Sequence, residues 1–597
     1  MCKILLKAGE YGFRVFIDPH QDVWSRFSGG SGAPGWTLEK VGLEMKNFTN
    51  GNAAMVHNTY PDPMDFPKMI WATNYYKLAA ATMFTLFFAG DVFAPKLFID
   101  GQSAQRFLQS HFLNAMSRVA QAIVATPGLA DRVVVGYDTL NEPHYGWVGW
   151  EDISILSPHQ ELRNGLTPTP LQAMVLGNGT ACDNVQVWEL SSLGPQKVSS
   201  TTVDPKGVRA WQEGVECIWA RHGVWDPDTG KCLLPLYFQT SPKTGNPVNF
   251  LVDFWKPFIN VFTTTLRKVH QGCIIFVEPP VNALPPDFGE DDATDNLCYA
   301  PHFYDGLTLL NKTFNQWFTV DYIGYLRGQY SSIAFALRFG IAGIKSAFTS
   351  QLNTLRVEGQ ENIGEYPCIF GEIGIPFDLD GKHAYISGDY SAQIKALDAN
   401  MTALERNLLN FTLWTYCPDN SNTWGDQWNG EDLSLWSPPL KAQVHSSQTE
   451  FTPEDLNAGA RAMEAYVRPC PIHVPGIPQW IEFDLATCTF KFTFRDFPTP
   501  CKNSDLEIFL PSLHFKTGHV RIEVSDGTVE WSEKAQRLYW RADLASPGPS
   551  SGKEFNAEPK EHTIAVYGSL GSYEEDYRAT QANDGTGDVL CPQCSVM

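Results

Sequence analysis

Short hydrophobic runs that alternate with helical stretches limit the fold of this chain more than any other feature of the sequence. The helical stretches, such as residues 102–125 and 250–270, repeat apolar residues at every third or fourth position. The short runs are rich in β-branched and aromatic residues and lie at residues 13–18, 133–140, 273–277, 297–302, 367–370 and 410–415. Because strands that alternate with helices build parallel sheets, we predict an α/β fold, a (β/α)8 TIM barrel.

The length of 597 residues predicts more than one domain. We assign residues 1–466 to the catalytic barrel, with a long loop insertion at about 152–245, where Pro, Gly and Thr interrupt the alternation. A proline-dense linker then leads into further strand-like runs, which predict a C-terminal β-sandwich over residues 467–570. Residues 571–597 are acidic and contain Gly and Asp, and we expect this tail to be disordered.

The charge balance excludes nucleic acid as a partner. Lys and Arg total 44 and Asp and Glu total 66, so the formal net charge is −22, which repels phosphate backbones. The longest apolar stretch, residues 78–90, is shorter than the ~20 residues that cross a bilayer, and we interpret it as a buried or substrate-facing helix. Thirteen cysteines at irregular spacings and a start without a signal peptide favour reduced thiols and a cytoplasmic location.

Two glutamates follow predicted strands at the place where barrel enzymes build their active sites. Glu142 follows residues 133–140 in Asn-Glu-Pro, and Glu372 follows residues 367–370 in Phe-Gly-Glu. Burying an ionisable residue directly after a strand is costly unless it is paired or used, and glycoside hydrolysis needs two carboxyl groups that flank one bond. Each motif alone is also compatible with an ion pair at the end of a strand.

Other polar and aromatic residues end neighbouring strands. His20 follows the first predicted strand, His302 and Tyr304 lie at the end of a later one, and Trp414 lies near the end of the last. A single His or Trp of this kind is also explained as a satisfied polar residue or a packed aromatic ring of the core. Together with the two glutamates, these residues occupy five strand ends in barrel order, and this indicates one site.

These motifs resemble those of the family 5 glycoside hydrolases, most closely the fungal steryl-β-glucosidase and glucosylceramidase branch related to endoglycoceramidases. The resemblance covers nearly the whole chain. It is carried by residues 16–36, 140–143, 300–305, 370–372 and 413–416, and by the C-terminal β domain.

The resemblance implies a retaining double displacement. Glu372 would attack the anomeric carbon as an ionised nucleophile, while protonated Glu142, the acid/base, would donate to the leaving oxygen. Water would then release the sugar. Such a pair stands ~5 to 5.5 Å apart. No metal and no cofactor is required.

The resemblance also implies supporting roles for residues near the two glutamates. Tyr304 would donate a hydrogen bond to the nucleophile, and His302 would hold the acid/base. The sugar itself would be bound by Asn141 at its 2-hydroxyl, by His20 and Asp22 at other hydroxyls, and by Trp414 stacked against the ring face.

The chain departs from the family at its beginning. A barrel of this family should have two strands before the run at residues 13–18, yet only about a dozen residues precede that run. We therefore expect the first two βα units to be missing. The family's second strand carries an arginine near the nucleophile, and no position of this sequence can supply it there.

Two aromatic and apolar runs, residues 71–98 and 333–348, bear on the substrate's aglycone. Both runs are compatible with the walls of a hydrophobic cleft for sterol or ceramide and equally with plain core. The leading function is therefore hydrolysis of steryl β-glucoside or glucosylceramide. The alternatives are a β-glucanase that acts on polysaccharide and a catalytically inactive glycolipid-binding protein, the latter because of the missing units.

The last residues predict a membrane location. Cys594 begins Cys-Ser-Val-Met, which fits a prenylation box, and Cys591 stands three residues upstream as a palmitoylation candidate. Stable anchoring takes two such signals. An accidental pair of cysteines in a disordered tail is the alternative. We expect peripheral association with the cytosolic face of a membrane through a lipidated C-terminus, next to the glycolipid substrate.

Overall fold

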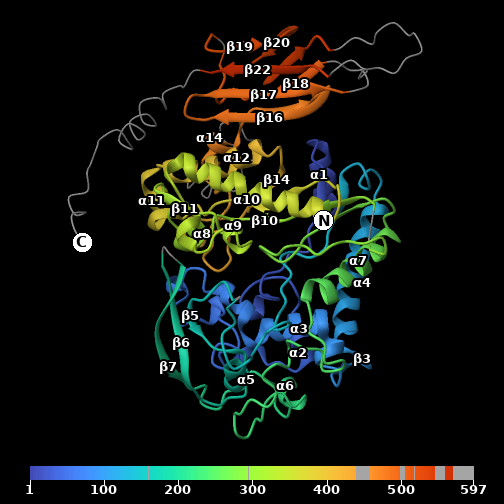
Figure 1. The fold of residues 1–597 in the computed structure, drawn as a ribbon, viewed down its shortest axis with the longest axis vertical. Coiled ribbons are helices and arrows are strands. Elements are labelled where there is room, and N and C mark those ends of the chain that lie inside the picture. The colour runs from blue at the N-terminus through green and yellow to red at the C-terminus, as the bar shows by residue number, and fades with distance from the viewer. Residues whose placement is uncertain are drawn as a thin grey trace, which may run out of the picture. The chain divides into compact units, whose positions relative to one another are not determined.

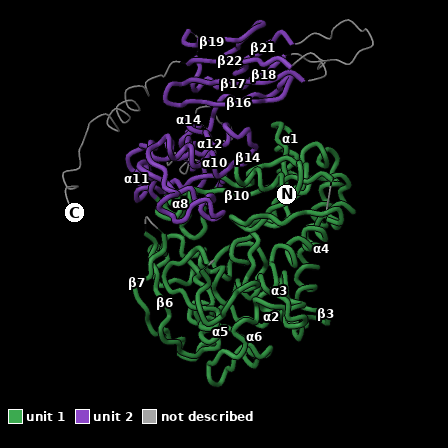
Figure 2. Tube along the Cα trace, in the orientation of Figure 1, with its two compact units in different colours: residues 1–312, 354–373, 419–432 green, residues 313–353, 374–418, 433–597 purple. Residues whose placement is uncertain are grey.

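The computed structural model describes residues 1–158, 160–191, 194–292, 295–438, 457–497, 505–516, 518–544 and 559–568. The chain forms two compact units, which Figure 2 shows in different colours. Unit 1 comprises residues 1–312, 354–373 and 419–432, and unit 2 comprises residues 313–353, 374–418 and 433–597. The predicted domain boundaries after residues 466 and 570 stay predictions, and the predicted tail at 571–597 lies outside the described residues.

A parallel sheet runs through unit 1, which Figure 1 draws mainly in blue to green. Its strands, in spatial order, are β1 (Val15–Ile17), β4 (Val134–Asp138), β8 (Ile274–Val277) and β9 (Leu297–Tyr299), and neighbouring strands are parallel. Each lies within a run that the sequence predicts as a strand. Parallel pairing brings the carboxyl ends of these strands to one edge of the sheet.

The predicted strand at residues 297–302 is in fact two strands. Beyond β9, Pro301 has no N–H to give to a neighbour, and the chain resumes pairing as β10 (His302–Phe303). Strand β10 runs parallel to β13 (Ile369–Ile373), and His302 lies directly opposite Glu372 in the register. The pairing of two short strands therefore places a predicted supporting residue beside the predicted nucleophile.

Helix α3 (Leu78–Phe93) is buried on nearly all of its faces, as one interpretation of its apolar stretch predicts. It packs against α4 (Ala104–Val124), and α4 packs against α7 (Lys256–Arg267). The rings of Phe87 and Phe258 meet edge to face with centroids 5.3 Å apart. Within the described ranges, no helix combines the length and the apolar character that crossing a membrane requires.

The insertion at about 152–245 is more regular than the predicted loop. It contains the antiparallel sheet β5 (Gly165–Thr167), β6 (Cys182–Ser191) and β7 (Gly194–Val203), and the helix α5 (Pro170–Gly177). Most side chains of β7 are exposed, so this strand lacks the alternation of apolar and polar residues that identifies strands in a sequence. Its backbone pairing with β6 holds it in place.

The remaining elements connect these layers. In unit 1 they are α1 (Cys2–Glu10), α2 (Trp36–Val41), β2 (Phe98–Ile99), β3 (Gln102–Ser103), α6 (Ile218–Arg221) and α8 (Gly306–Asn311). In unit 2 they are β11 (Phe318–Val320), α9 (Tyr322–Leu326), β12 (Leu337–Phe339), α11 (Leu379–Ser387), α12 (Ser391–Arg406), β14 (Asn410–Leu413) and α14 (Met463–Tyr466). Helix α10 (Gly340–Asn362) begins in unit 2 and ends in unit 1.

The C-terminal part of unit 2 is built from two four-stranded antiparallel sheets. One has the order β15 (Cys470–His473), β18 (Asp505–Phe509), β21 (Arg537–Arg541) and β20 (Thr528–Ser532). The other has the order β16 (Gly476–Asp484), β17 (Thr489–Asp496), β22 (Glu561–Tyr567) and β19 (Arg521–Val524). Side chains from both sheets, such as Phe492, Ile508 and Trp540, form one buried core.

Two of these strands are absent from the sequence-based prediction. Strand β15 lies within the stretch that we predicted as a proline-dense linker. It is at an edge of its sheet, where a proline is tolerated, so the proline content is compatible with a strand there. Strand β20 lies at the opposite edge and is largely exposed, and it therefore shows little hydrophobic alternation.

Arg468 joins helix α12 to the first long strand of the C-terminal sheets. Its buried guanidinium lies 2.6 Å from Asp398 and 2.6 Å from Glu405, and it donates to the carbonyl oxygen of Phe483 in β16. The two carboxylates raise the pKa of Arg468, against the effect of its burial. A buried charge of this kind is stable only because it is paired.

We expect Arg468→Met to lower the free energy of unfolding by about 3–5 kcal/mol, because Glu405 and Asp398 lose a buried counter-charge. Arg521→Met is the matched control, since Arg521 and its partner Glu523 are both exposed, and we expect a change of about 0–1 kcal/mol. Denaturant unfolding of both variants measures the difference. Equal effects of the two substitutions would show that the Arg468 cluster does not stabilise unit 2.

Candidate active site

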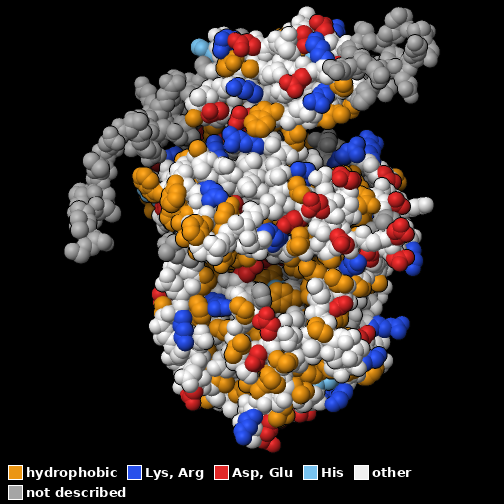
Figure 3. Space-filling view, viewed as in Figure 1, with side chains coloured by type: hydrophobic (Ala, Val, Ile, Leu, Met, Phe, Trp, Pro, Cys, Tyr) orange, Lys and Arg blue, Asp and Glu red, His pale blue; other side chains and the backbone are white. Residues whose placement is uncertain are grey.

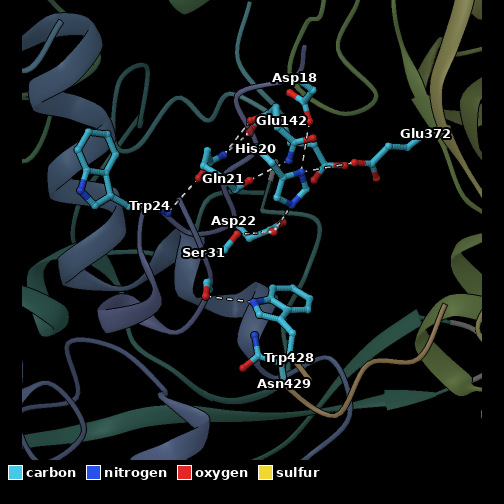
Figure 4. A network of polar contacts seen from close by, with 12 residues as sticks. Asp18, His20, Gln21, Asp22, Trp24, Ser31, Glu142, Glu372, Trp428 and Asn429 are labelled. Carbon is cyan, nitrogen blue, oxygen red and sulfur yellow. Dashed lines mark hydrogen bonds and ion pairs between the residues drawn. The ribbon is translucent and has the colours of Figure 1, made fainter. Parts of the chain in front are cut away.

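Seven of the eight residues that the sequence predicts for the site lie in unit 1, at the carboxyl ends of its parallel strands. Figure 4 shows part of this cluster, with Glu372 pointing toward His20 and Glu142. The seven are His20, Asp22, Asn141, Glu142, His302, Tyr304 and Glu372. The eighth, Trp414, follows β14 in unit 2. The backbone of Gly374 lies close to the carbonyl oxygen of Trp414, and a Cβ at residue 374 would stand only 2.2 Å from that oxygen.

The ring of His302 lies between the two predicted catalytic carboxyl groups. Its Nδ1 is 3.1 Å from Oε1 of Glu142 and 3.7 Å from Oε2 of Glu372. One carboxyl oxygen of Glu142 lies within 4.8 Å of one of Glu372. This separation fits a nucleophile and an acid/base that share one bond, and it leaves no room for the water molecule that an inverting enzyme places between them.

Glu372 is held at one oxygen only. The hydroxyl of Tyr304 donates to Oε2 at 2.7 Å, while the buried Oε1 accepts no hydrogen bond from the described residues. Burial raises the pKa of Glu372 to about 7, although His302, His20 and Tyr304 all act to lower it. Desolvation therefore outweighs these partners in the free site, and the expectation of an ionised nucleophile stays a prediction.

Two imidazolium groups supply positive charge beside the carboxyl groups. Burial opposes the charge of His302, but Glu372 and Glu142 raise its pKa to about 9. Burial likewise opposes the charge of His20, and Asp22, Asp18 and Glu372 raise its pKa to about 11. Both rings therefore stay charged at neutral pH.

His20 and Asp22 contact each other, as Figure 4 shows. Nε2 of His20 lies 2.7 Å from Oδ2 of Asp22, which also accepts a hydrogen bond from the hydroxyl of Ser31 at 3.2 Å. The glycine-rich turn packs tightly behind them, and a Cβ on Gly30 would stand 1.9 Å from the carbonyl oxygen of Asp22. A glycine at this position therefore lets Asp22 reach its place.

Asn141 is fully buried beside Glu142. Its Nδ2 donates to the carbonyl oxygen of Gln21 at 2.8 Å, and its Oδ1 accepts no hydrogen bond from the described residues. An amide oxygen in this position is able to accept a hydrogen bond from a sugar hydroxyl. The geometry is compatible with the predicted contact to the 2-hydroxyl.

Comparison with known proteins identifies the family. A profile of the glycoside hydrolase family 5 C-terminal domain matches residues 468–551. A glucosylceramidase of Aspergillus fumigatus is 40% identical over an alignment that covers 90% of this chain and 80% of that protein. The chain belongs to glycoside hydrolase family 5. An ergosteryl-beta-glucosidase of Saccharomyces cerevisiae is 35% identical, with 89% of this chain and 80% of that protein covered.

The solved structures give the fold of this family 5 enzyme. The structure of Cryptococcus neoformans sterylglucosidase 1 with tris matches with a TM-score of 0.89 at 39% identity, and covers 95% of this chain and 83% of that chain. The predicted TIM barrel is therefore confirmed at the level of the fold, and so is the predicted family. The number of βα units at the start of the barrel stays a prediction.

Three acidic residues that lie in this family 5 site were not predicted from the sequence. Glu278 follows β8 directly and is buried, Asp138 ends β4, and Asp18 follows β1. Burial raises the pKa values of Glu278 and Asp138 well above the usual range, and repulsion adds to this, by Asp138 at Glu278 and by Asp18 at Asp138. The criterion that selected Glu142, an ionisable residue directly after an apolar strand, also applies to Glu278.

Three groups of side chains in the site have atoms close enough to hold a metal ion. They are Asp18, His20 and Glu372; Glu142, His302 and Glu372; and Asp18, Asp138 and Glu278. Two of these groups contain Glu372, and the third consists of carboxyl groups beside the catalytic pair. A cation bound at any of them would compete with the roles predicted for the two catalytic glutamates. The expectation that no metal and no cofactor is needed stays a prediction.

The two apolar runs of this family 5 chain have different surroundings. Residues 71–98 contain helix α3 and are mostly buried, as the interpretation as core predicts. In residues 333–348, Phe335 and Phe339 are 67% and 70% exposed, while Ile344 and Phe348 are buried. Hydrophobic side chains gather over β11 and α11 in Figure 3, and acidic and basic side chains are interspersed across the same face.

The acidic limb of the pH profile reports Glu372. Because only ionised Glu372 attacks, we expect kcat/KM for an aryl β-glucoside to fall about tenfold per pH unit below a pKa of about 7. Tyr304→Phe removes a donor that stabilises the ionised form, so the limb should move to higher pH. Tyr539→Phe, in an exposed position of β21, is the control and should leave the limb in place. A limb that Tyr304→Phe leaves unmoved would contradict this account.

Proposed function

We propose that this chain is a retaining β-glucosidase that hydrolyses the glucosidic bond of a glycolipid, either a steryl β-glucoside or glucosylceramide. The observation that carries the proposal is the pair Glu142 and Glu372, with carboxyl oxygens within 4.8 Å of each other on either side of the His302 Nδ1. The names of the relatives, glucosylceramidase and ergosteryl-beta-glucosidase, support the substrate class.

In the first displacement, Oε1 of Glu372 forms a bond to the anomeric carbon as the bond from that carbon to the aglycone oxygen breaks. Glu142 gives its proton to the leaving oxygen, so the aglycone departs as a neutral alcohol. In the second displacement, a water molecule attacks the glucosyl ester while ionised Glu142 takes its proton. Glu372 departs as a carboxylate, and glucose is released with its β configuration retained.

The neighbouring residues prepare these steps. Tyr304 holds Oε2 of Glu372, which leaves Oε1 for the attack. The charged ring of His302 stabilises the negative charge that passes between the two carboxyl groups. Asn141 accepts a hydrogen bond from the sugar 2-hydroxyl, and His20 and Asp22 bind further hydroxyls, as the resemblance to the family implies. The stacking of Trp414, a residue of unit 2, on the ring face stays a prediction from that resemblance.

We also propose that the enzyme associates with the cytosolic face of a membrane through lipidation. Cys594 and Cys591 lie outside the described residues, so this rests on the sequence of the C-terminus alone. Prenylation acts on cytoplasmic proteins, which agrees with the number and irregular spacing of the cysteines. We expect Cys594→Ser to move the protein from the membrane to the soluble fraction of a cell lysate, and an unchanged membrane fraction would disprove the lipid anchor.

Glucose release from a lipid substrate tests the proposed function. We expect the purified chain to release glucose from ergosteryl β-glucoside and from glucosylceramide in detergent, and NMR to show β-glucose as the first product. Glu372→Gln should lower the rate by about 10⁴-fold or more, because the nucleophile is lost. Glu365→Gln, an exposed glutamate of the same unit, is the matched control and should retain the activity.

The outcomes separate the alternative functions. Activity on soluble β-glucans without activity on either lipid would favour the β-glucanase alternative. Retained binding of both lipids without glucose release would favour an inactive glycolipid-binding protein. Release of α-glucose as the first product would contradict the retaining mechanism.

A further inference from the structure

Glu278 is a buried side chain that the mechanism above leaves unused. It follows strand β8 and is only 1% exposed. Its Oε1 accepts a hydrogen bond from the backbone N–H of Glu142 at 2.6 Å. The same oxygen lies 3.5 Å from Nε2 of His302, whose Nδ1 contacts the carboxyl group of Glu142. One oxygen of Glu278 therefore contacts the acid/base both at its backbone and, through His302, at its side chain.

The backbone of Glu142 needs such support. Its φ of 39° lies in the left-handed region, which residues with a Cβ adopt rarely and at a cost. A strained conformation persists only where the surroundings determine it. At Glu142 that conformation decides where the carboxyl group projects from the end of β4.

Both neighbouring strands contribute to holding this conformation. Strand β4 lies between β1 and β8 in the sheet. From the β8 side, Glu278 holds the N–H of Glu142. From the β1 side, Nε2 of Gln21 donates to the carbonyl oxygens of Asn141 at 2.9 Å and Glu142 at 3.1 Å. The backbone of the acid/base is therefore fixed at its donor and at its acceptor by two side chains from different strands.

We propose that Glu278 is a positioning residue for the acid/base of the reaction, which fixes the strained backbone of Glu142 directly and its carboxyl group through His302. The inference rests on the proposed function, because it takes Glu142 as the proton donor to the leaving group. Glu278 contacts neither Glu372 nor the attacking oxygen directly in any interaction described above, and its hydrogen bond is to the backbone of Glu142, so its effect should be largest on steps that need the acid/base.

The charge of Glu278 predicts which substitution is tolerated. Burial and the nearby Asp138 and Asp18 raise the pKa of Glu278 well above its usual range, which favours the neutral form of its carboxyl group. Asp18 and Asp138 each have an oxygen within 4.8 Å of one of Glu278, whose Oε2 has no hydrogen-bond partner among the described residues. Glutamine has the same shape, an oxygen for the N–H of Glu142, and N–H donors for the carboxylates. Leucine has neither an acceptor nor a donor.

Substrates that differ in their leaving group separate positioning from a general structural role. A dinitrophenol leaves without a proton, whereas an alcohol needs one from Glu142. For Glu278→Leu, we expect kcat/KM to fall about 10²-fold or more on octyl β-glucoside and less than about tenfold on 2,4-dinitrophenyl β-glucoside. Glu278→Gln should stay within about threefold of the wild type on both. Gln21→Leu, which removes the other support, should show the same difference between substrates as Glu278→Leu.

Two further measurements exclude misfolding as the cause. Trapping Glu372 with a 2-deoxy-2-fluoroglucoside counts the folded sites, and rates are expressed per trapped site. Azide accepts the glucosyl group without base catalysis, so it should speed the turnover of dinitrophenyl glucoside by Glu278→Leu and not by the wild type. Equal losses on the two substrates, or a Gln variant as impaired as the Leu variant, would overturn the proposal.

The test stays decisive if the proposed function fails. Hydrolysis of aryl and octyl glucosides without hydrolysis of either lipid would refute the proposed substrate and leave the comparison of leaving groups intact. If the wild type hydrolyses no β-glucoside, crystal structures of the wild type and Glu278→Leu decide. The inference holds if φ of Glu142 leaves the left-handed region in the variant, and it is refuted if Glu142 keeps its φ near 39° and its distance to Glu372.

Discussion

The site depends on charged imidazole rings placed among buried carboxyl groups. Two carboxylates whose oxygens lie within 4.8 Å of each other repel each other by about 3 kcal/mol or more at an effective dielectric constant of 20, which raises a pKa by roughly two pH units. Burial is the largest cause of the rise in the pKa of Glu372 to about 7, and repulsion by Glu142 adds to it. The ring of His302, which contacts Glu142 and Glu372 and approaches Glu278, limits the repulsion and lets these groups lie close together.

The parallel sheet explains how so many acidic side chains come together. Strands β1, β4 and β8 are neighbours, and each ends at an acidic residue that follows or closes an apolar run. Parallel pairing aligns the carboxyl ends of neighbouring strands, so the acidic residues at these ends lie next to one another. Each such group is unfavourable for stability, because burial costs more than partial pairing returns. Their concentration at one edge is typical of a site selected for chemistry rather than for folding.

The sequence was sufficient to predict the parts of the fold that follow from hydrophobic pattern. The buried strands of the parallel sheet and helices α4 and α7 fall where periodicity and apolar runs predict them. Strands β7 and β20 were missed because they are exposed and are held by backbone pairing, which leaves no alternation in the sequence. Strand β15 was missed because a proline at a sheet edge looks the same in the sequence as a proline in a linker.

The candidate site followed from strand ends, but its electrostatics did not. Glu142, Glu372, His302 and Tyr304 were predicted as neighbours because each follows an apolar strand, and the contacts between them are the direct result of the sheet register. Glu278 met the same criterion but was not predicted, because its proposed role depends on a hydrogen bond from the backbone N–H of Glu142, which follows the neighbouring strand. The ionisation of Glu372 depends on the sum of burial and several partners, which a sequence does not reveal.

The unequal surroundings of the two catalytic glutamates decide which of them holds their shared proton. Repulsion at this distance favours the state with one proton on the pair, and only the form with Glu142 protonated and Glu372 ionised is ready to react. The hydroxyl of Tyr304 and the charge of His20 act on Glu372 and stabilise its ionised form. His302 contacts both carboxyl groups and so favours neither as strongly. The asymmetry introduced by Tyr304 and His20 therefore opposes the effect of burial on Glu372 and favours the ionised form that the first displacement requires.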